Sequence, residues 1–332
     1  MPVITLSSGE QFETQAGETL LAASERAGKG IAYSCRNGRC SACRCRVLGG
    51  DSIALYPESG LSEQERGQGW ILGCVRAPHG DMAIEPATPA GLALPPRQTL
   101  PCRIHRLQAL APDVLQVTLR LPPSSTFRFL PGQHIEVIGQ GGVRRSYSLA
   151  NASAAEHLLE LHVREVPCGE MSRYWFGQAR EGDLLRLNGP LGTNFLRDIV
   201  GKELVFLATG TGIAPVKSML AGLQGTPVQE RPNSVVLYWG GRTPADLYWD
   251  ASEAAMLDRF VPVLSNPPAA WRGARGHVQQ VQLAECAGLS NTVVYACGSE
   301  RMIHSAKEAL LAAGLPPTRF LADAFVCSAT HD

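Results

Sequence analysis

The sequence lacks an excess of charge of either sign, because its 332 residues include 30 lysines and arginines and 30 aspartates and glutamates. A chain without a basic excess has no general attraction to nucleic acid or anionic lipid, so we expect neither as a partner. No apolar run approaches the roughly 18 residues that a membrane-spanning helix needs, and we expect no membrane span. The opening residues, MPVITLSSGEQFETQ, lack the basic and apolar regions of a signal peptide, so we expect a cytoplasmic protein.

Cysteine, by contrast, is plentiful and unevenly placed. Four of the ten cysteines lie within residues 35–45, and the other six are scattered along the chain. Secreted scaffolds that depend on disulfides are usually much shorter than this chain. In a reducing compartment, a group of closely spaced cysteines indicates metal binding or redox chemistry.

Local composition divides the chain into three predicted domains. Residues 86–98, PATPAGLALPPRQ, contain four prolines and almost no hydrophobic periodicity, which is typical of a semi-rigid linker. The pattern changes again near residue 200, where short alternating runs give way to continuous apolar runs. We therefore predict domains at residues 1–90, 98–200 and 201–332.

The second and third domains differ in their hydrophobic patterns. Runs such as HIEVIG, RRSYSLA and DLLRLNG alternate and are separated by Pro, Gly and Asn, which predicts an antiparallel barrel or sandwich. Beyond residue 200, ELVFLAT, SVVLYWG and TVVYAC are apolar throughout, and helical stretches lie between such runs. This alternation predicts an α/β domain with a parallel sheet and helices on both of its faces.

Four cysteines, Cys35, Cys40, Cys43 and Cys74, follow the pattern C-x4-C-x2-C-x30-C. Three thiolates on one loop and a fourth from a distant segment match the plant-type spacing for a 2Fe–2S cluster, and the loop's N–H groups can stabilise the cluster sulfurs. A zinc site and a set of free thiols are the alternatives, although zinc ligands usually come as two CxxC-like pairs and only one is present. Cys45 lies on the predicted strand that follows, and we interpret it as a buried thiol rather than a ligand.

The first domain resembles a plant-type ferredoxin, an α+β module with the β-grasp fold. Besides the cysteine motif, the stretch PVITLSSGEQFETQAGETLLAASERAG predicts two strands and a helix. The stretch LYPESGLSEQERGQGWILGCV resembles the usual approach to the fourth ligand. The resemblance implies that the four cysteines of the motif hold a 2Fe–2S cluster.

The stretch RRSYSLAN, residues 144–151, resembles the R-x-Y-S motif of the ferredoxin–NADP reductase-like flavin domain, a six-stranded antiparallel β-barrel. A flavin diphosphate needs a fixed cation, which Arg145 can supply. The isoalloxazine ring needs a flat apolar platform, which Tyr147 can supply. The resemblance gives Ser148 a catalytic role, as the hydrogen-bonding partner of the flavin N5 atom that accepts hydride.

A second segment, CGEMSRYW, also carries predicted FAD contacts. It places Gly169, Met171 and Ser172 at a predicted helix start, where free N–H groups favour phosphate. On their own, Arg145 and Tyr147 would fit a solvated surface charge and an ordinary strand aromatic. Between a ferredoxin module and a parallel-sheet domain, the two segments together predict an FAD site.

The stretch VFLATGTGIAPVKSML predicts a strand, a glycine loop and a helix. Gly210 and Gly212, with Thr211 between them, allow the backbone to approach a pyrophosphate at the helix N-terminus. Pro215 stands where the third glycine of the G-x-G-x-x-G fingerprint would be, so that fingerprint is not met. The G-T-G-x-A-P form instead resembles the NAD(P) domain of the same reductase family.

Three further positions are predicted to contact the nicotinamide nucleotide or the flavin. The resemblance places Cys297, followed by Gly298 in VVYACGSE, as a catalytic cysteine beside the nicotinamide C4, whereas the alternative is a buried core thiol. Arg242 could accept the 2′-phosphate of NADPH or be a solvated loop charge, and we favour NADH. Phe325, in RFLADAFVCS, could lie against the flavin, as the family's last aromatic often does, or be the last core residue.

The order of ferredoxin, flavin and nicotinamide domains resembles the one-component iron–sulfur flavoprotein reductases, which include oxygenase reductases and the CDP-6-deoxy-3,4-glucoseen reductases of dideoxysugar synthesis. The resemblance implies an electron-transfer oxidoreductase with a 2Fe–2S cluster, FAD, and NADH or NADPH. Because nicotinamide gives up two electrons at once and the cluster takes one, the flavin must stand between them. The expected acceptor is a redox partner protein, either a pyridoxamine-phosphate-dependent sugar dehydrase or a terminal oxygenase. A redox sensor and a zinc-bound interaction module remain as alternatives from other classes.

Overall fold

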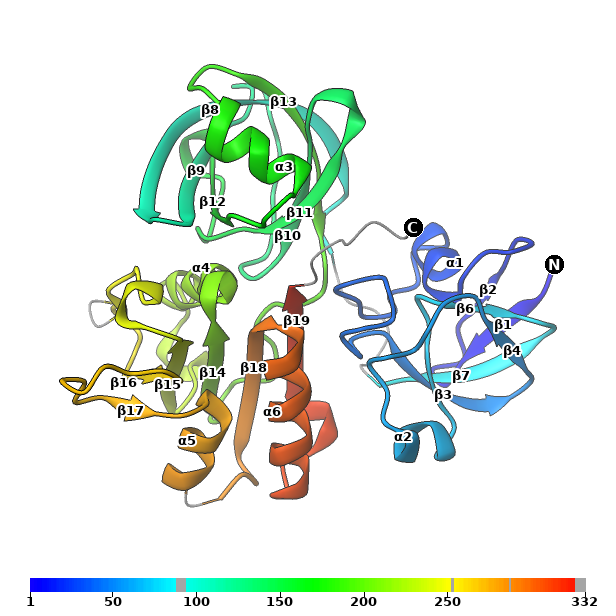
Figure 1. The fold of residues 1–332 in the computed structure, drawn as a ribbon. Coiled ribbons are helices and arrows are strands. Elements are labelled where there is room, and N and C mark those ends of the chain that lie inside the picture. Colours follow the sequence, from blue (N-terminus) through cyan, green and yellow to red (C-terminus); the bar gives the residue numbers. More distant parts are fainter. Residues whose placement is uncertain (88–93, 252–253, 287, 326–332) are drawn as a thin grey trace. The chain divides into compact units, whose positions relative to one another are not determined.

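The computed structural model describes residues 1–87, 94–251, 254–286 and 288–325. The chain forms two compact units, and the main break between them falls after residue 93 (Figure 1). Among the described residues, no helix is both long and apolar enough to cross a membrane.

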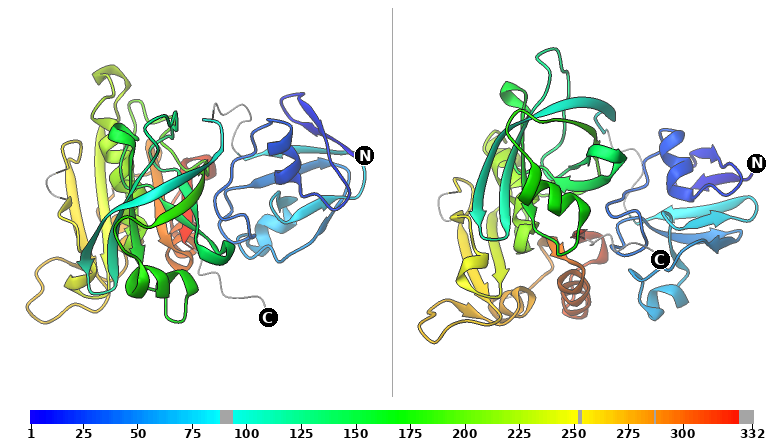
Figure 2. Two further views of the ribbon diagram at one scale, coloured as in Figure 1. Left: turned by 90° about the horizontal axis from the view of Figure 1, so that it is seen from above. Right: turned by 45° about the horizontal axis from the view of Figure 1, so that its top comes forward.

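The first unit is a five-stranded sheet with a helix along its side (Figures 1 and 2). The strand order is β2-β1-β7-β3-β5, in which β1 and β7 are parallel and the other pairs are antiparallel. Helix α1 begins after Thr19, whose side chain accepts a hydrogen bond from the Ala22 N–H at 3.2 Å. Leu20 and Leu21 of this helix join the apolar core of the sheet, which gives the predicted α+β arrangement. The elements are β1 (Val3–Leu6), β2 (Gln11–Glu13), α1 (Leu20–Arg26), β3 (Arg44–Gly49), β4 (Ser52–Ala54), α2 (Glu63–Gly67), β5 (Trp70–Leu72), β6 (Arg76–Pro78) and β7 (Met82–Pro86).

The second unit begins with a six-stranded antiparallel barrel. Its strand order is β11-β10-β13-β8-β9-β12. The two outer strands meet where Leu149 pairs with Leu161, and the Ala150 N–H donates to the Glu160 carbonyl at 2.8 Å. This closure leaves no long sheet edge exposed. The elements are β8 (Gln98–Ala111), β9 (Val114–Arg120), β10 (His134–Ile138), β11 (Arg144–Ser148), β12 (Leu158–Arg164), α3 (Glu170–Arg173) and β13 (Leu184–Leu191).

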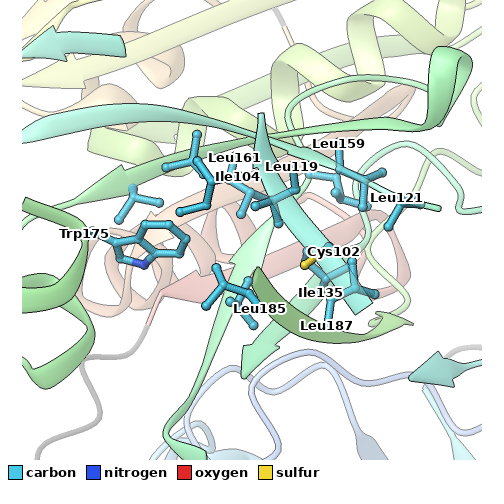
Figure 3. Packing of buried hydrophobic residues seen from close by; sticks show 14 of the residues in the cluster. Cys102, Ile104, Leu119, Leu121, Ile135, Leu159, Leu161, Trp175, Leu185 and Leu187 are labelled. Carbon is cyan, nitrogen blue, oxygen red and sulfur yellow. The ribbon is translucent and has the colours of Figure 1, made fainter. Parts of the chain in front are cut away.

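Apolar side chains fill the inside of the barrel. On β12, Leu159, Leu161 and Val163 alternate inward and are buried. Figure 3 shows Leu159 and Leu161 among side chains from the other strands, with Trp175 at one side of the cluster. Because the interior is packed, a ligand of this domain must bind on its outer surface or at one of its ends.

After the barrel, the chain forms a six-stranded sheet in the order β17-β16-β15-β14-β18-β19; all but the first residue of β19 is grouped with the first unit. β14 pairs in parallel with β15 and β18, and β15 pairs in parallel with β16. Phe206, Leu207 and Ala208 of β14 have no exposed surface, as expected for a strand that is covered on both faces. The elements are β14 (Glu203–Thr209), α4 (Ile213–Leu223), β15 (Ser234–Gly241), β16 (Arg259–Leu264), β17 (Ala274–Arg275), α5 (Val278–Glu285), β18 (Thr292–Ser299), α6 (Glu300–Ala312) and β19 (Phe320–Phe325).

The strand order of this sheet reverses beside β14. The chain runs from β14 outward to β17 and then returns to the other side of β14 as β18 (Figure 1). Ligands of open α/β sheets bind at such a point, beyond the carboxyl ends of the two strands. The predicted fold class is therefore confirmed, with an α+β module, an antiparallel six-stranded barrel and an α/β parallel sheet. One difference is that the described residues between β15 and β16 include only the short 3-10 turn Pro244–Asp246 and no α-helix.

Candidate cofactor and dinucleotide sites

The four predicted cluster cysteines approach one another as two pairs. Cys35, Cys40 and Cys43 lie on the irregular segment between α1 and β3, and Cys74 follows β5. The thiols of Cys35 and Cys40 are hydrogen-bonded to each other, as are those of Cys43 and Cys74. Among the residues that the structure describes, no three His, Cys, Asp or Glu side chains are grouped as a single metal ion would require. Two separate pairs fit a cluster that contains two irons, each with two thiolate ligands.

Backbone N–H groups stabilise negative charge on one of these sulfurs. The Cys40 thiol, and with it three N–H groups within residues 37–40, lower the pKa of Cys35 to about 6, against the effect of burial. A thiolate that is already favoured in this way is suited to bind a metal. The sequence prediction that N–H groups point toward the sulfurs therefore agrees with the environment of Cys35.

The shape of the cysteine loop (residues 35–43) depends on close contact with the segment after β4. Gly38 has a φ of 79°, and a Cβ atom added to it would lie 2.2 Å from the Pro57 carbonyl oxygen. The Gly60 N–H donates to the Gly38 carbonyl at 2.8 Å, and the Ser41 hydroxyl donates to the Gly60 carbonyl. Only glycine fits at position 38, so the loop sequence is set by packing as well as by ligation.

The fifth cysteine near the loop has a different environment. Cys45 is fully buried on β3, and its thiol donates to the Cys43 carbonyl at 3.7 Å. Burial raises the pKa of Cys45 to about 12, so this side chain remains a neutral thiol. Its neighbour Arg44 is also buried and forms an ion pair with Glu65 at 2.6 Å. These observations support a structural role for Cys45.

The predicted flavin residues share strand β11. Arg145 and Tyr147 lie on one face of the strand, and Ser148 is buried on the other. The Tyr147 hydroxyl accepts a hydrogen bond from the Trp175 indole at 2.9 Å, and the two rings meet edge to face at 6.2 Å. Burial raises the pKa of Tyr147 to about 12, so the hydroxyl stays protonated. The result is a fixed aromatic ring two positions from a guanidinium, which fits a flavin and its diphosphate.

The second flavin segment lies against the turn before β11. Gly169 is the N-cap of α3, and the Ser172 hydroxyl accepts a hydrogen bond from the Val166 N–H at 2.9 Å. Met171 is buried, and a Cβ added to Gly139 would lie 2.8 Å from its sulfur. The structure therefore brings the two predicted FAD segments next to each other, although 20 residues separate Ser148 from Gly169 in the chain.

The predicted nicotinamide residues meet at the carboxyl ends of β14 and β18. Ala208 pairs with Cys297 in the sheet, and Cys297 is fully buried. A Cβ added to Gly212 would lie 2.1 Å from the Cys297 carbonyl oxygen. Gly298 has a φ of 135°, and a Cβ there would lie 2.3 Å from the Thr209 hydroxyl oxygen. We call this region, Thr209–Gly212 with Cys297–Gly298, the β14–β18 junction. Close contact with the opposite segment leaves no room for a side chain at Gly212 or Gly298.

The junction leads directly into helix α4. Gly210–Gly212, which includes Thr211, forms a 3-10 turn, and Pro215 is the third residue of the helix, where its missing N–H costs nothing. The Arg164 guanidinium lies beside the turn, since a Cβ on Gly210 would be 2.8 Å from its Nη1 atom. A cation and free helix N–H groups at one place suit a pyrophosphate.

A partly buried polar network, which sequence reasoning missed, joins β12 of the barrel to α4. Glu160 accepts hydrogen bonds from Lys217 at 2.5 Å and pairs with His162 at 2.9 Å, and the other His162 ring nitrogen lies 3.1 Å from the Tyr248 hydroxyl. Burial alone would raise the pKa of Glu160, but its bonds to His162 and Lys217 outweigh this effect and hold the pKa at about 2. Alternating polar residues on a strand, such as Glu160 and His162, normally indicate exposure to solvent. The sequence around them carries no sign that α4 covers these side chains.

Two further predicted positions, Arg242 and Phe325, are not among the residues of this junction. The Arg242 side chain is 78% exposed, and its guanidinium is 4.0 Å from the Asp246 carboxylate. Hydrogen bonds from the Thr243 and Arg242 N–H groups outweigh burial and lower the pKa of Asp246, so it is ionised near neutral pH. Phe325 is half-buried at the end of β19.

Three protein-family models match successive parts of the chain. They are the 2Fe-2S iron-sulfur cluster binding domain at residues 4–79, the oxidoreductase FAD-binding domain at residues 101–195 and the oxidoreductase NAD-binding domain at residues 206–308. The predicted cofactors, a 2Fe–2S cluster, FAD and NAD(P)H, are thereby confirmed.

Relatives with the same order of domains match along nearly the whole chain. The CDP-6-deoxy-L-threo-D-glycero-4-hexulose-3-dehydrase reductase of Yersinia pestis is 36% identical over 325 residues, which are 97% of each chain. The reductase component of the naphthalene 1,2-dioxygenase system of Pseudomonas putida is 31% identical and covers 93% of this chain and 94% of its own. Among solved structures, the Amycolatopsis cytochrome P450 reductase GcoB is 30% identical, with a TM-score of 0.76 over 99% of this chain and 100% of its own.

Proposed function

This chain belongs to the family of NAD(P)H-dependent iron–sulfur flavoprotein reductases, and we propose that its electron acceptor is a sugar-nucleotide dehydrase. As a member of that family, it is an oxidoreductase that passes electrons from NAD(P)H through FAD and a 2Fe–2S cluster to a partner enzyme. FAD, when bound, accepts the hydride pair and releases electrons singly. The protein's own residues bind and orient the donor, the flavin and the cluster.

The choice of acceptor rests on how much of the chain is matched by the Yersinia pestis relative. The Yersinia relative, whose name makes it the reductase of a CDP-6-deoxy-hexulose dehydrase, matches over 97% of both chains at 36% identity, so the match includes the cluster-bearing module. That module is the part from which electrons leave, so its surface selects the partner. A component of an oxygenase system, either the terminal oxygenase or an intermediate ferredoxin, is the second candidate acceptor. The naphthalene dioxygenase relative, by its name a ferredoxin–NAD(P)+ reductase component, also matches over more than nine-tenths of both chains.

Reconstitution with each candidate partner tests this proposal. The holoenzyme would be mixed, under anaerobic conditions, with a purified pyridoxamine-phosphate-dependent dehydrase and its CDP-6-deoxy-hexulose substrate, and NADH consumption and 3-deoxy sugar formation would be followed. The control is an aerobic mixture in which a ring-hydroxylating oxygenase and its aromatic substrate replace the dehydrase and the sugar nucleotide. Turnover with the dehydrase alone is expected, whereas turnover only with the oxygenase would replace this acceptor by the second candidate.

We further propose which residues hold each cofactor. The pairing of thiols supports the four loop-associated cysteines as cluster ligands, the adjacency of β11 and α3 supports the FAD contacts, and the β14–β18 junction supports the dinucleotide contacts. The cluster ligands are Cys35, Cys40, Cys43 and Cys74; the FAD contacts are Arg145, Tyr147, Ser148, Gly169, Met171, Ser172 and Phe325; the dinucleotide contacts are Gly210, Thr211, Gly212, Pro215, Cys297 and Gly298.

NADH is the donor that we propose. The ionised Asp246 carboxylate lies beside Arg242, the residue that would otherwise receive the 2′-phosphate of NADPH, and its charge opposes a phosphate dianion. The dissociation constants of NADH and NADPH test this preference. The unaltered protein should bind NADH more tightly, and Asp246→Asn should reduce the ratio between the two dissociation constants. Tighter NADPH binding by the unaltered protein would contradict it.

The domain boundaries and the compartment are also proposals. The boundaries at residues 1–90, 98–200 and 201–332 are supported by the change from the sheet of the first unit to the barrel and then to the α/β layer. The cytoplasm is supported by the cysteines, because no disulfide joins those that the structure describes.

A further inference from the structure

Asn194 lies on a segment that connects the flavin barrel to the β14–β18 junction. The segment follows β13 and is held to the barrel by the Gln133 side chain, which donates to the Gly192 carbonyl at 2.8 Å. A Cβ on Gly132 would lie 2.2 Å from the Asn194 carbonyl oxygen, so the backbone there is tightly packed. On the other side, the Tyr295 hydroxyl of β18 donates to the Phe195 carbonyl at 3.0 Å. The position of Asn194 is therefore fixed by both domains of the second unit.

The side chain of Asn194 is aimed at the proposed nicotinamide cysteine. Its Nδ2 atom donates to the Cys297 sulfur at 3.5 Å, and the residue is only 5% exposed. Its Oδ1 atom is buried and accepts no hydrogen bond from any residue that the structure describes. A buried amide oxygen left without a donor is costly, so a native protein normally supplies it with one.

The substrate carries a donor of the right kind. The nicotinamide ring bears a carboxamide next to C4, the carbon that the family resemblance places beside Cys297. The NH2 group of that carboxamide has two N–H donors. A nicotinamide placed beside Cys297 would bring this NH2 group into the region of the Asn194 Oδ1 atom. Thr209 and the glycines of the junction leave this region without bulky side chains.

We infer that Asn194 Oδ1 accepts a hydrogen bond from the carboxamide NH2 of the nicotinamide, so that Asn194 is a specificity-determining residue for the donor. This inference rests on the proposed placement of the nicotinamide at Cys297. The amide bridges two groups, since Nδ2 bonds to the cysteine sulfur while Oδ1 bonds to the ring substituent. The nicotinamide is thereby positioned by a side chain of the segment that is anchored on the flavin barrel.

The test compares three oxidised dinucleotides on the FAD- and cluster-loaded protein by isothermal titration, which measures affinity without turnover. The probes are NAD+, thionicotinamide adenine dinucleotide, which keeps the NH2 group, and 3-acetylpyridine adenine dinucleotide, which has a methyl group in its place. The unaltered protein should bind the acetylpyridine form about 10-fold to 100-fold more weakly than the other two. Asn194→Ala should bind all three within about twofold of one another. Equal affinities in the unaltered protein, or full discrimination in Asn194→Ala, would overturn the inference.

Two further variants separate recognition from folding. Asn194→Asp keeps an acceptor oxygen and should retain the preference for NH2-bearing dinucleotides; loss of the preference would count against the assigned bond. Asn188→Ala removes another buried asparagine, whose Oδ1 accepts from Arg97 at 2.8 Å, and it should discriminate like the unaltered protein. If none of the three dinucleotides bound the unaltered protein, the proposed nicotinamide site itself would fail, which is a distinct outcome from binding without discrimination.

Discussion

The cysteine loop of the first unit and the β14–β18 junction of the second both place cysteines against tightly packed glycines, but they are built differently. The loop is irregular, and its cysteines face one another as pairs that suit an inorganic core. At the junction, Cys297 is a fully buried residue of a regular strand that pairs in parallel with β14. In the loop, the proposed cluster would join the two pairs of thiols, whereas at the junction the sheet is fully formed without the proposed dinucleotide. Substitutions in the two regions should therefore have different effects on cofactor content, substrate affinity and stability.

The largest difference should follow from Cys40→Ser. Loss of one ligand removes the cluster, so cytochrome c reduction by NADH should be abolished. Reduction of ferricyanide should continue, because the flavin can pass electrons directly to a small acceptor. Continued cytochrome c reduction by the cluster-free variant would show that the cluster does not stand between the flavin and this acceptor.

At the junction, Gly212→Ala should disturb the sheet as well as the substrate site. The new Cβ would lie 2.1 Å from the Cys297 carbonyl, so backbone must move, at a cost of about 1–3 kcal/mol in unfolding free energy. The melting temperature should fall and the NADH dissociation constant should rise, while the visible absorption of the cluster should be unchanged. Gly225→Ala is the matched control, since no atom lies within 4 Å of its added Cβ. Unchanged NADH affinity in Gly212→Ala would remove the junction from the dinucleotide site.

Substitution of Tyr147, the proposed aromatic platform for the flavin, should have an effect of intermediate size on cofactor binding. Tyr147→Ala removes the ring that packs against Trp175, and the FAD content of the purified protein should fall several-fold. Tyr147→Phe keeps the ring and loses only the hydroxyl that accepts the 2.9 Å bond from Trp175, so it should retain most of its FAD. Full FAD content in the alanine variant would exclude Tyr147 from the site.

The smallest effect on function should come from Cys45→Ser. The serine would bury a hydroxyl in an apolar core, so the unfolding free energy should fall by about 1–2 kcal/mol. The visible spectrum of the cluster should be unchanged, because Cys45 faces the core and the Cys43 carbonyl. A bleached protein would make Cys45 a ligand and would undo the comparison between the two regions.

The same comparison explains what the sequence could reveal. The cluster ligands were predictable because three of them lie on one short loop, where ligand spacing is a property of the local chain. The strands and most helices were predictable because the barrel strands alternate and the parallel strands are apolar throughout. Asn194 and the network around Glu160 carried no local signal, since their roles depend on which surfaces the fold covers. The packing of Gly212 against Cys297 likewise arises from strand order, and 84 residues separate the two positions.

An anaerobic absorption titration of the holoenzyme with NADH tests the central claim most directly. The flavin accepts two electrons and the cluster one, so both sets of bands should bleach together after about one and a half equivalents of NADH. Bleaching of the flavin at about one equivalent, with the cluster left oxidised, would contradict the path from NADH through FAD to the 2Fe–2S cluster.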